Sequence, residues 1–98
     1  MLGLCKRAGR VVSGAELCEK AAREGAAALL ILAGDASENT KMKFRRLCLN
    51  NDIKLVETGS ISLLGHAVGK EKRSVVCVTD EGFARKLTEI YERERMEM

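Results

Sequence analysis

The sequence contains no proline and no tryptophan, and it has only three aromatic side chains among 98 residues. Because no proline-rich or low-complexity stretch resembles a linker, we expect residues 1–98 to form one domain with frayed last residues. The aromatic residues are Phe44, Phe83 and Tyr91. Three rings are too few for a surface that reads single-stranded nucleic acid by stacking several bases, which excludes one large class of RNA-binding modules.

Long apolar runs and closely spaced cysteines are also absent. No stretch approaches the ~20 apolar residues that span a bilayer, and Lys6 and Arg7 follow a very short apolar piece, the reverse of a secretory signal. We therefore expect a cytoplasmic protein with no membrane partner. The cysteines at positions 5, 18, 48 and 77 lack the two-to-four-residue spacing of zinc ligands, so we expect reduced, buried side chains and no metal.

Positive charge is only slightly in excess, because the sequence has 17 Lys and Arg and 14 Asp and Glu. The resulting +3 does not by itself indicate a nucleic-acid partner. Residues 1–78 carry 13 basic and 8 acidic side chains, whereas residues 79–98 carry 4 and 6, so a basic body precedes an acidic end. Candidates for backbone contacts to nucleic acid, about half of them expected to be ordinary solvated charges, are Lys6, Arg7, Arg10, Lys41, Lys43, Arg45, Arg46, Lys70, Lys72 and Arg73.

Helical and extended patterns alternate along the chain. Residues 28–33 form a continuous apolar run, typical of a central strand covered on both faces. Further strands are predicted at 11–12, 53–57 and 74–79, and helices at 1–8, about 14–25, 60–66 and about 80–95, with another helix that begins at a cap in 35–38 and runs to about 51. This order predicts a three-layer α/β/α sandwich in the α/β class, and an antiparallel first strand would make its four-stranded sheet mixed.

Two of the predicted helices have recognisable start signals. Ser13 and Glu16 have the spacing of a capping box, and the segment from Asp35 to Glu38 predicts a second cap. The expected buried stripes are Leu17, Cys18 and Ala21 on the first helix and Thr40, Phe44, Leu47 and Cys48 on the second.

Three short motifs resemble a known family when they are taken in order. They are Gly14 with Lys20-Ala21 and Gly25, then Ala27, Leu29, Ala33 and Asp35, then residues 64–70 with the sequence LGHAVGK. At this spacing, residues 1 to about 90 resemble the kink-turn RNA-binding ribosomal proteins, the seven-Ae and thirty-e group. Residues 8–14, 35–40 and 79–84 are most similar to the short bacterial YlxQ-like members.

The resemblance implies RNA binding without catalysis or a cofactor, with the start of the second helix and two nearby loops docked on sharply bent RNA. It implies a monomer that binds structured RNA, with ribosomal RNA and the ribosome as candidate partners in translation. Gly59, Ser60 and Ser62 suit backbone contacts to an unpaired nucleotide. The residues expected at the RNA surface are Arg10, Gly14, Glu16, Lys20, Glu38, Asn39, Lys41, Gly59, Ser60, Ser62, Leu64, Gly65 and His66.

The sequence departs from the family at two positions. Family binders carry polar pairs such as Asn-Glu or Lys-Gln where this chain has Glu16 and Leu17. Leu17 cannot hydrogen-bond a base, so we expect it to pack in the core. For Glu16, the capping box and a base contact remain two open interpretations.

Two other functions are considered beside RNA binding. An enzyme or small-molecule site would lie beyond the carboxyl ends of the strands, where Asp35 is expected, but no glycine-rich phosphate loop accompanies it. His66 has no nearby nucleophile or acid in the sequence that would indicate catalysis. A protein-interaction adaptor that keeps the fold with weak RNA affinity is the other alternative.

Overall fold

The structure is a computed structural model that describes residues 9–96. Its strands are β1 (Val11–Ser13), β2 (Leu29–Leu32), β3 (Lys54–Glu57) and β4 (Val75–Val78). Its helices are α2 (Ala15–Arg23), α3 (Glu38–Asn50), α4 (Ile61–Ala67) and α5 (Glu81–Met96). The helix expected over residues 1–8 lies outside the described residues, as do the last two residues, 97 and 98.

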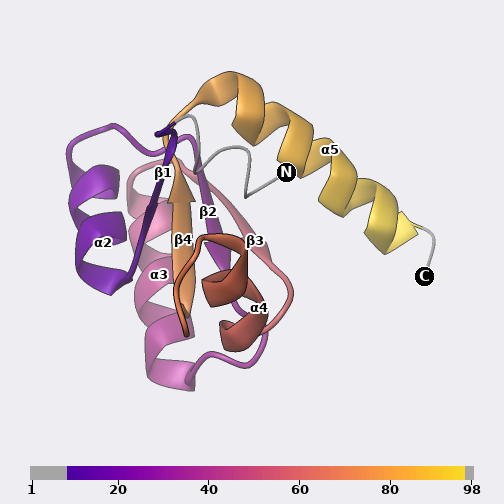
Figure 1. Ribbon diagram of the computed structural model, residues 1–98. Coiled ribbons are helices and arrows are strands. Elements are labelled where there is room, and N and C mark those ends of the chain that lie inside the picture. Colours follow the sequence, from indigo (N-terminus) through magenta and orange to yellow (C-terminus); the bar gives the residue numbers. More distant parts are fainter. Residues whose placement is uncertain (1–8, 97–98) are drawn as a thin grey trace.

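The four strands form one mixed sheet in the order β1-β4-β2-β3. β4 pairs antiparallel with both β1 and β2, whereas β2 and β3 are parallel. Figure 1 shows α2 and α3 on one side of this sheet and α4 and α5 on the other. The predicted α/β/α sandwich, its mixed sheet and the central position of β2 are confirmed.

The direction of β4 follows from the shortness of α4. Seven helical residues cover only about 10 Å, and the segment from Val68 to Ser74 then leads the chain back toward the start of α4. β4 therefore begins at the end of the sheet where β2 finishes, with Leu32 paired to Val75. The alternation of helical and extended patterns does not predict this reversal. It indicates how long each helix or strand is, but not the direction in which a strand runs in the sheet.

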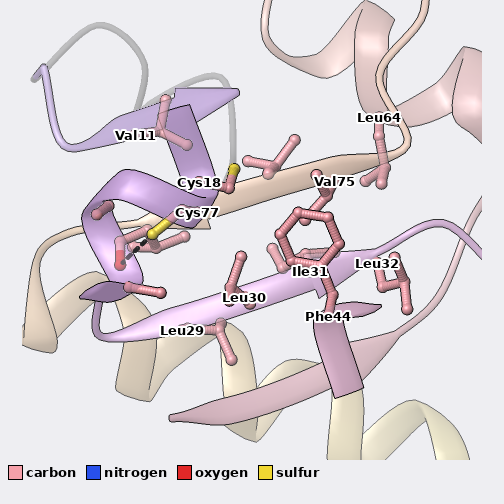
Figure 2. Packing of buried hydrophobic residues seen from close by; sticks show 14 of the residues in the cluster. Val11, Cys18, Leu29, Leu30, Ile31, Leu32, Phe44, Leu64, Val75 and Cys77 are labelled. Carbon is pink, nitrogen blue, oxygen red and sulfur yellow. Dashed lines mark hydrogen bonds between the residues drawn. The ribbon is translucent and has the colours of Figure 1, made fainter. Parts of the chain in front are cut away.

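The core is built from the two central strands and the helices on either side (Figure 2). Every residue of β2 and β4 is fully buried, as expected for strands covered on both faces. Phe44 and Cys48 bury the inner face of α3 as predicted, while Thr40 and Leu47 are only half-buried. All the side chains buried in residues 9–93 are apolar.

The inner face of α2 differs from the prediction. Cys18, Ala21 and Ala22 are buried, whereas Leu17, which was expected in the core, is 54% exposed. Adjacent helical residues are 100° apart around the axis, so the small side chains at 18, 21 and 22 turn Leu17 toward solvent. These small side chains let α2 lie close to the sheet.

Three free cysteines lie in the described part of the chain, and all are buried. Cys18 donates a weak hydrogen bond from its Sγ to the carbonyl oxygen of Val12, at 3.7 Å. Burial raises the pKa of Cys48 to about 11 and that of Cys77 to about 12, and it raises the pKa of Cys18 as well. Cys5 lies outside the described residues.

These thiols should resist alkylation in the folded protein. In a Cys5→Ser variant at pH 8, a thiol with a pKa of about 11 is ionised in roughly one molecule per thousand, and only the thiolate reacts with iodoacetamide. We expect mass spectrometry to detect no label in the native protein and three labels after unfolding in urea. Native-state labelling as fast as that of a free thiol would contradict the burial of these side chains.

Candidate nucleic-acid interface

Three helices begin at one end of the sheet. β1, β2 and β3 finish there at Ser13, Leu32 and Glu57, and β4 begins there at Val75. We call this the site end; in Figure 1 it is the lower end of the sheet, where α2, α3 and α4 all start. Each helix start carries partial positive charge from unpaired backbone amides, so the three together favour an anionic partner.

Hydrogen bonds join the loops at the site end. The amide of Gly34 donates to the carbonyl oxygen of Gly59 at 3.0 Å. The amide of Ile61 donates to Oδ1 of Asp35 at 2.7 Å, and its carbonyl oxygen accepts from the amide of Arg73 at 3.0 Å. The segments after β2, after β3 and before β4 therefore form one connected surface.

The start of α2 is open. Gly14 is the N-cap residue, at φ 96° and ψ 151°, and no side chain caps the helix. The predicted capping box is wrong: Ser13 is the last residue of β1, and its Oγ accepts a hydrogen bond from Nε of Arg73 at 3.2 Å. With Gly14 as the cap, Leu17 rather than Glu16 is the third helical residue, which leaves Glu16 without the capping role.

The other two helix starts are closed by hydroxyl groups. Oγ of Ser37 accepts from the amide of Thr40 at 3.2 Å, and Oγ of Ser60 accepts from the amide of Leu63 at 3.1 Å. The predicted cap of α3 is thus made by Ser37, while Asp35 binds the first amide of α4 instead. Within residues 9–96, the start of α2 therefore has no side-chain cap, whereas a serine hydroxyl caps each of the other two helices.

Most of the expected RNA-contacting residues come together at the site end. Those in the loops or in the first turn of α2, α3 or α4 are Gly14, Glu16, Glu38, Asn39, Gly59, Ser60 and Ser62. Lys20 is exposed farther along α2, about 8 Å from its start at 1.5 Å per residue. Lys41 is half-buried in the first turn of α3.

Arg10 lies elsewhere. It precedes β1 at the opposite end of the sheet, since Val11 pairs with Val78, the last residue of β4. There its Nε lies 3.9 Å from Oδ2 of Asp80, just before α5. An extended strand separates Arg10 from Gly14, so the structure does not bring Arg10 to the site end.

Two residues of the LGHAVGK motif are buried. Leu64 packs in the core and is 4% exposed. A Cβ on Gly65 would lie 2.7 Å from the carbonyl oxygen of Glu71 and from the Cα of Lys72, so only glycine lets the following loop lie against α4. These two residues position the loop, whereas His66 is exposed in the last turn of α4.

Arg73 lies close to the start of α2, although the sequence distinguished it from the other basic residues in no way. Besides its contact with Ser13, its Nη1 donates to the carbonyl oxygen of Lys72 at 2.7 Å. A Cβ on Gly14 would lie 3.9 Å from its Nε, which places the guanidinium beside the open start of α2. No sequence signal reveals this contact, because it joins residues 60 positions apart.

Replacing Gly65 with alanine should destabilise the fold. Gly→Ala inside a helix ordinarily stabilises by about 1 kcal/mol, but the added Cβ would meet backbone atoms at 2.7 Å. We expect the free energy of unfolding in urea to fall by about 1 to 3 kcal/mol, and a Ser62→Ala control on the exposed face of α4 to stay within about 0.5 kcal/mol. A stabilised Gly65→Ala variant would contradict the close packing.

Residues 1–88 match the ribosomal protein L7Ae/L30e/S12e/Gadd45 family. The chain belongs to this family. This match confirms the resemblance inferred from the sequence motifs. The matched residues include all of the site end.

Two relatives of this family member carry the name RNA-binding protein YlxQ. The Bacillus subtilis (strain 168) protein is 45% identical over 87 residues, which cover 89% of this chain and 87% of that protein. The Enterococcus faecium protein is 35% identical over 92 residues, which cover 94% and 88%.

Solved structures agree with this assignment. A Bacillus halodurans protein of unknown function has a TM-score of 0.89 and 38% identity, covering 93% of this chain and 92% of its own. The Giardia lamblia 15.5kD RNA binding protein has a TM-score of 0.79 at 20% identity, covering 94% and 82%. At that identity, the Giardia protein shows a shared fold alone.

Within residues 9–96, no helix is both long enough and apolar enough to cross a membrane. The same residues include no group of three His, Cys, Asp or Glu side chains arranged to hold a metal ion.

Proposed function

We propose that this protein binds structured RNA with a kink-turn-like bend, without catalysis, through the site end. The observation that carries the proposal is the open start of α2, where Gly14 is the cap and the Arg73 guanidinium lies alongside. Family membership and two relatives named as RNA-binding proteins support it. We further propose that the protein acts as a cytoplasmic monomer, with ribosomal RNA as one source of the bent RNA.

The groups at the site end are suited to contact the phosphate backbone of a folded RNA. Free amides at a helix start bind phosphate oxygens, and the missing Cβ of Gly14 lets the RNA backbone come close. Arg73 adds a guanidinium whose planar donors suit phosphate. Glu38 and Asn39, exposed at the start of α3, offer hydrogen-bonding groups for base edges.

None of the three aromatic rings is placed to stack bases at the site end. Phe44 is fully buried, while Phe83 and Tyr91 are half-buried on α5, which starts at the opposite end of the sheet. Folded RNA is recognised mainly by its shape and its backbone. The lack of exposed rings therefore favours bent, structured RNA over single strands.

Binding to a kink-turn RNA and to a straight duplex of the same length tests the proposal. We expect tighter binding to the bent RNA, with the logarithm of the binding constant falling steeply with salt. Lys20→Gln should weaken binding several-fold and lower the salt slope by about 0.7 to 0.9, the loss of one phosphate contact. A Lys86→Gln control on the exposed surface of α5 should change neither quantity.

The outcomes of this assay separate RNA binding from the alternatives. Equal affinity for the bent RNA and the duplex would refute recognition of the bend. Absence of binding to both would refute RNA binding and favour the adaptor. An effect of Lys86→Gln as large as that of Lys20→Gln would show that net charge, rather than the site end, determines binding.

The departure at Glu16 and Leu17 generates a second test. Both side chains are exposed, so the variant Glu16→Asn/Leu17→Glu should fold normally and keep the net charge. It restores the polar pair of family binders, and a good hydrogen-bonded contact to a base contributes about 1 to 3 kcal/mol. We expect affinity for the kink-turn RNA to rise about tenfold.

A control for the added carboxylate alone is Leu49→Glu, which places a Glu at an exposed apolar position on α3 and lowers the net charge by one. It should not raise the affinity. If the double variant also leaves the affinity unchanged, positions 16 and 17 do not contact the bases.

A further inference from the structure

A second charged surface lies between α2 and α3, away from the site end. Both helices begin at the site end and run in the same direction along one face of the sheet (Figure 1). Between them is a hollow of about 270 Å³. Its lining residues, which we call the α2–α3 groove, are Glu19, Arg23, Lys43, Arg46, Leu47 and Asn50.

One carboxylate organises the cations of the α2–α3 groove. Oε1 of Glu19 lies 2.6 Å from Nη2 of Arg23, and Oε2 lies 2.9 Å from Nζ of Lys43. The Glu19 side chain is 18% exposed, whereas those of Arg23 and Lys43 are more than half exposed. Glu19 thus holds both cations from below, and their charged groups remain accessible at the rim.

The groove keeps an excess of positive charge. The hydrogen bond from Lys43 lowers the pKa of Glu19, so this carboxylate stays ionised at neutral pH. Arg46 has no ion-pair partner among residues 9–93. Three cations therefore face one carboxylate, and an anion would find two uncompensated charges.

Neighbouring surfaces lack this excess. The adjoining hollow on α2 shares Glu19 and Arg23 with the groove, and its other lining residues are Glu16, Lys20 and Glu24, so its carboxylates outnumber its cations. On the far side of α3, Arg45 donates two hydrogen bonds to Glu57, at 2.8 and 2.7 Å, and is already neutralised. The excess of positive charge therefore lies on the α3 side of the groove, at Lys43 and Arg46.

The position of the groove relates it to the site end. Arg46 is eight residues beyond Glu38, so it lies about 12 Å along α3 from the start of that helix. Nucleotides that touch the helix starts do not reach so far, but the backbone of an RNA arm that leaves the bend along α3 does. Polar and charged side chains with only a half-buried Leu47 suit a phosphate backbone better than an apolar partner.

We propose that the α2–α3 groove is a second contact for the same RNA, in which Arg23, Lys43 and Arg46 hold phosphates of one arm several nucleotides from the bend. This inference rests on the proposed function and adds a distinct surface to it. It predicts that affinity depends on the length of that arm.

The test compares two kink-turn RNAs that differ only in whether the arms are long or cut back to a few base pairs. With the long-arm RNA, Lys43→Gln/Arg46→Gln should weaken binding about tenfold at low salt and lower the salt slope by about 1.4 to 1.8, the loss of two phosphate contacts. With the short-arm RNA, the double variant should bind like the wild type. Lys20→Gln should weaken binding to both RNAs.

The matched control is Arg85→Gln/Lys86→Gln, which removes the same charge from exposed positions on α5. It should leave binding to both RNAs unchanged. The groove proposal is overturned if the Lys43/Arg46 variant binds the long-arm RNA like the wild type, if it weakens both RNAs equally, or if the control has the same effect. Failure of the wild type to bind either RNA would instead refute the proposed function.

Discussion

The antiparallel pairing of β4 with β1 and β2 determines where every functional segment lies. β2 and β4 are buried on both faces, so their backbone groups must find hydrogen-bond partners within the sheet. Because β4 alone is reversed, β1, β2 and β3 all finish at the same end. The three helices that follow these strands therefore start side by side. A parallel β4 would place the start of α5 there as well and would move the α4–β4 loop, with Arg73, away from Gly14.

The sequence predicted the core better than it predicted the surface. Apolar runs identify β2 and β4 to within a residue or two, because a strand buried on both faces has no polar positions. Phe44 and Cys48 follow from helical spacing in the same way. These features depend on neighbours in the chain, which a sequence pattern contains.

Sequence-based predictions fail where the local structure depends on the backbone conformation of one residue or on a contact between residues far apart in the chain. The positive φ of Gly14 moves the start of α2 one residue beyond Ser13, which breaks the capping box and changes which residue is third in the helix. Ser13 is instead hydrogen-bonded to Arg73, 60 positions away. Arg10 lies at the opposite end of the sheet from Gly14, and this location depends on the register of β1 with β4. None of these features produces a periodic pattern of residue types from which it could be predicted.

Ion pairs decide which cations are available to an anionic partner. Exposed pairs contribute only about 0 to 1 kcal/mol to stability, so their main effect here is on the distribution of free charge. Asp80 faces Arg10 and Glu57 neutralises Arg45, whereas Glu19 pairs with two cations and offsets only one of their charges. A net charge of +3 therefore becomes concentrated at particular places on the surface.

The residues that build the fold are separate from those that would read an RNA. In α2 the buried side chains are Cys18, Ala21 and Ala22, and positions 16 and 17 are exposed. A polar pair or Glu16-Leu17 can occupy those positions at little cost to stability, since exposed substitutions usually change it by less than about 0.5 kcal/mol. Gly14 and Gly65 have no such freedom, because a positive φ and a 2.7 Å approach exclude larger side chains. The exposed helix positions can therefore change without altering the placement of the helix starts.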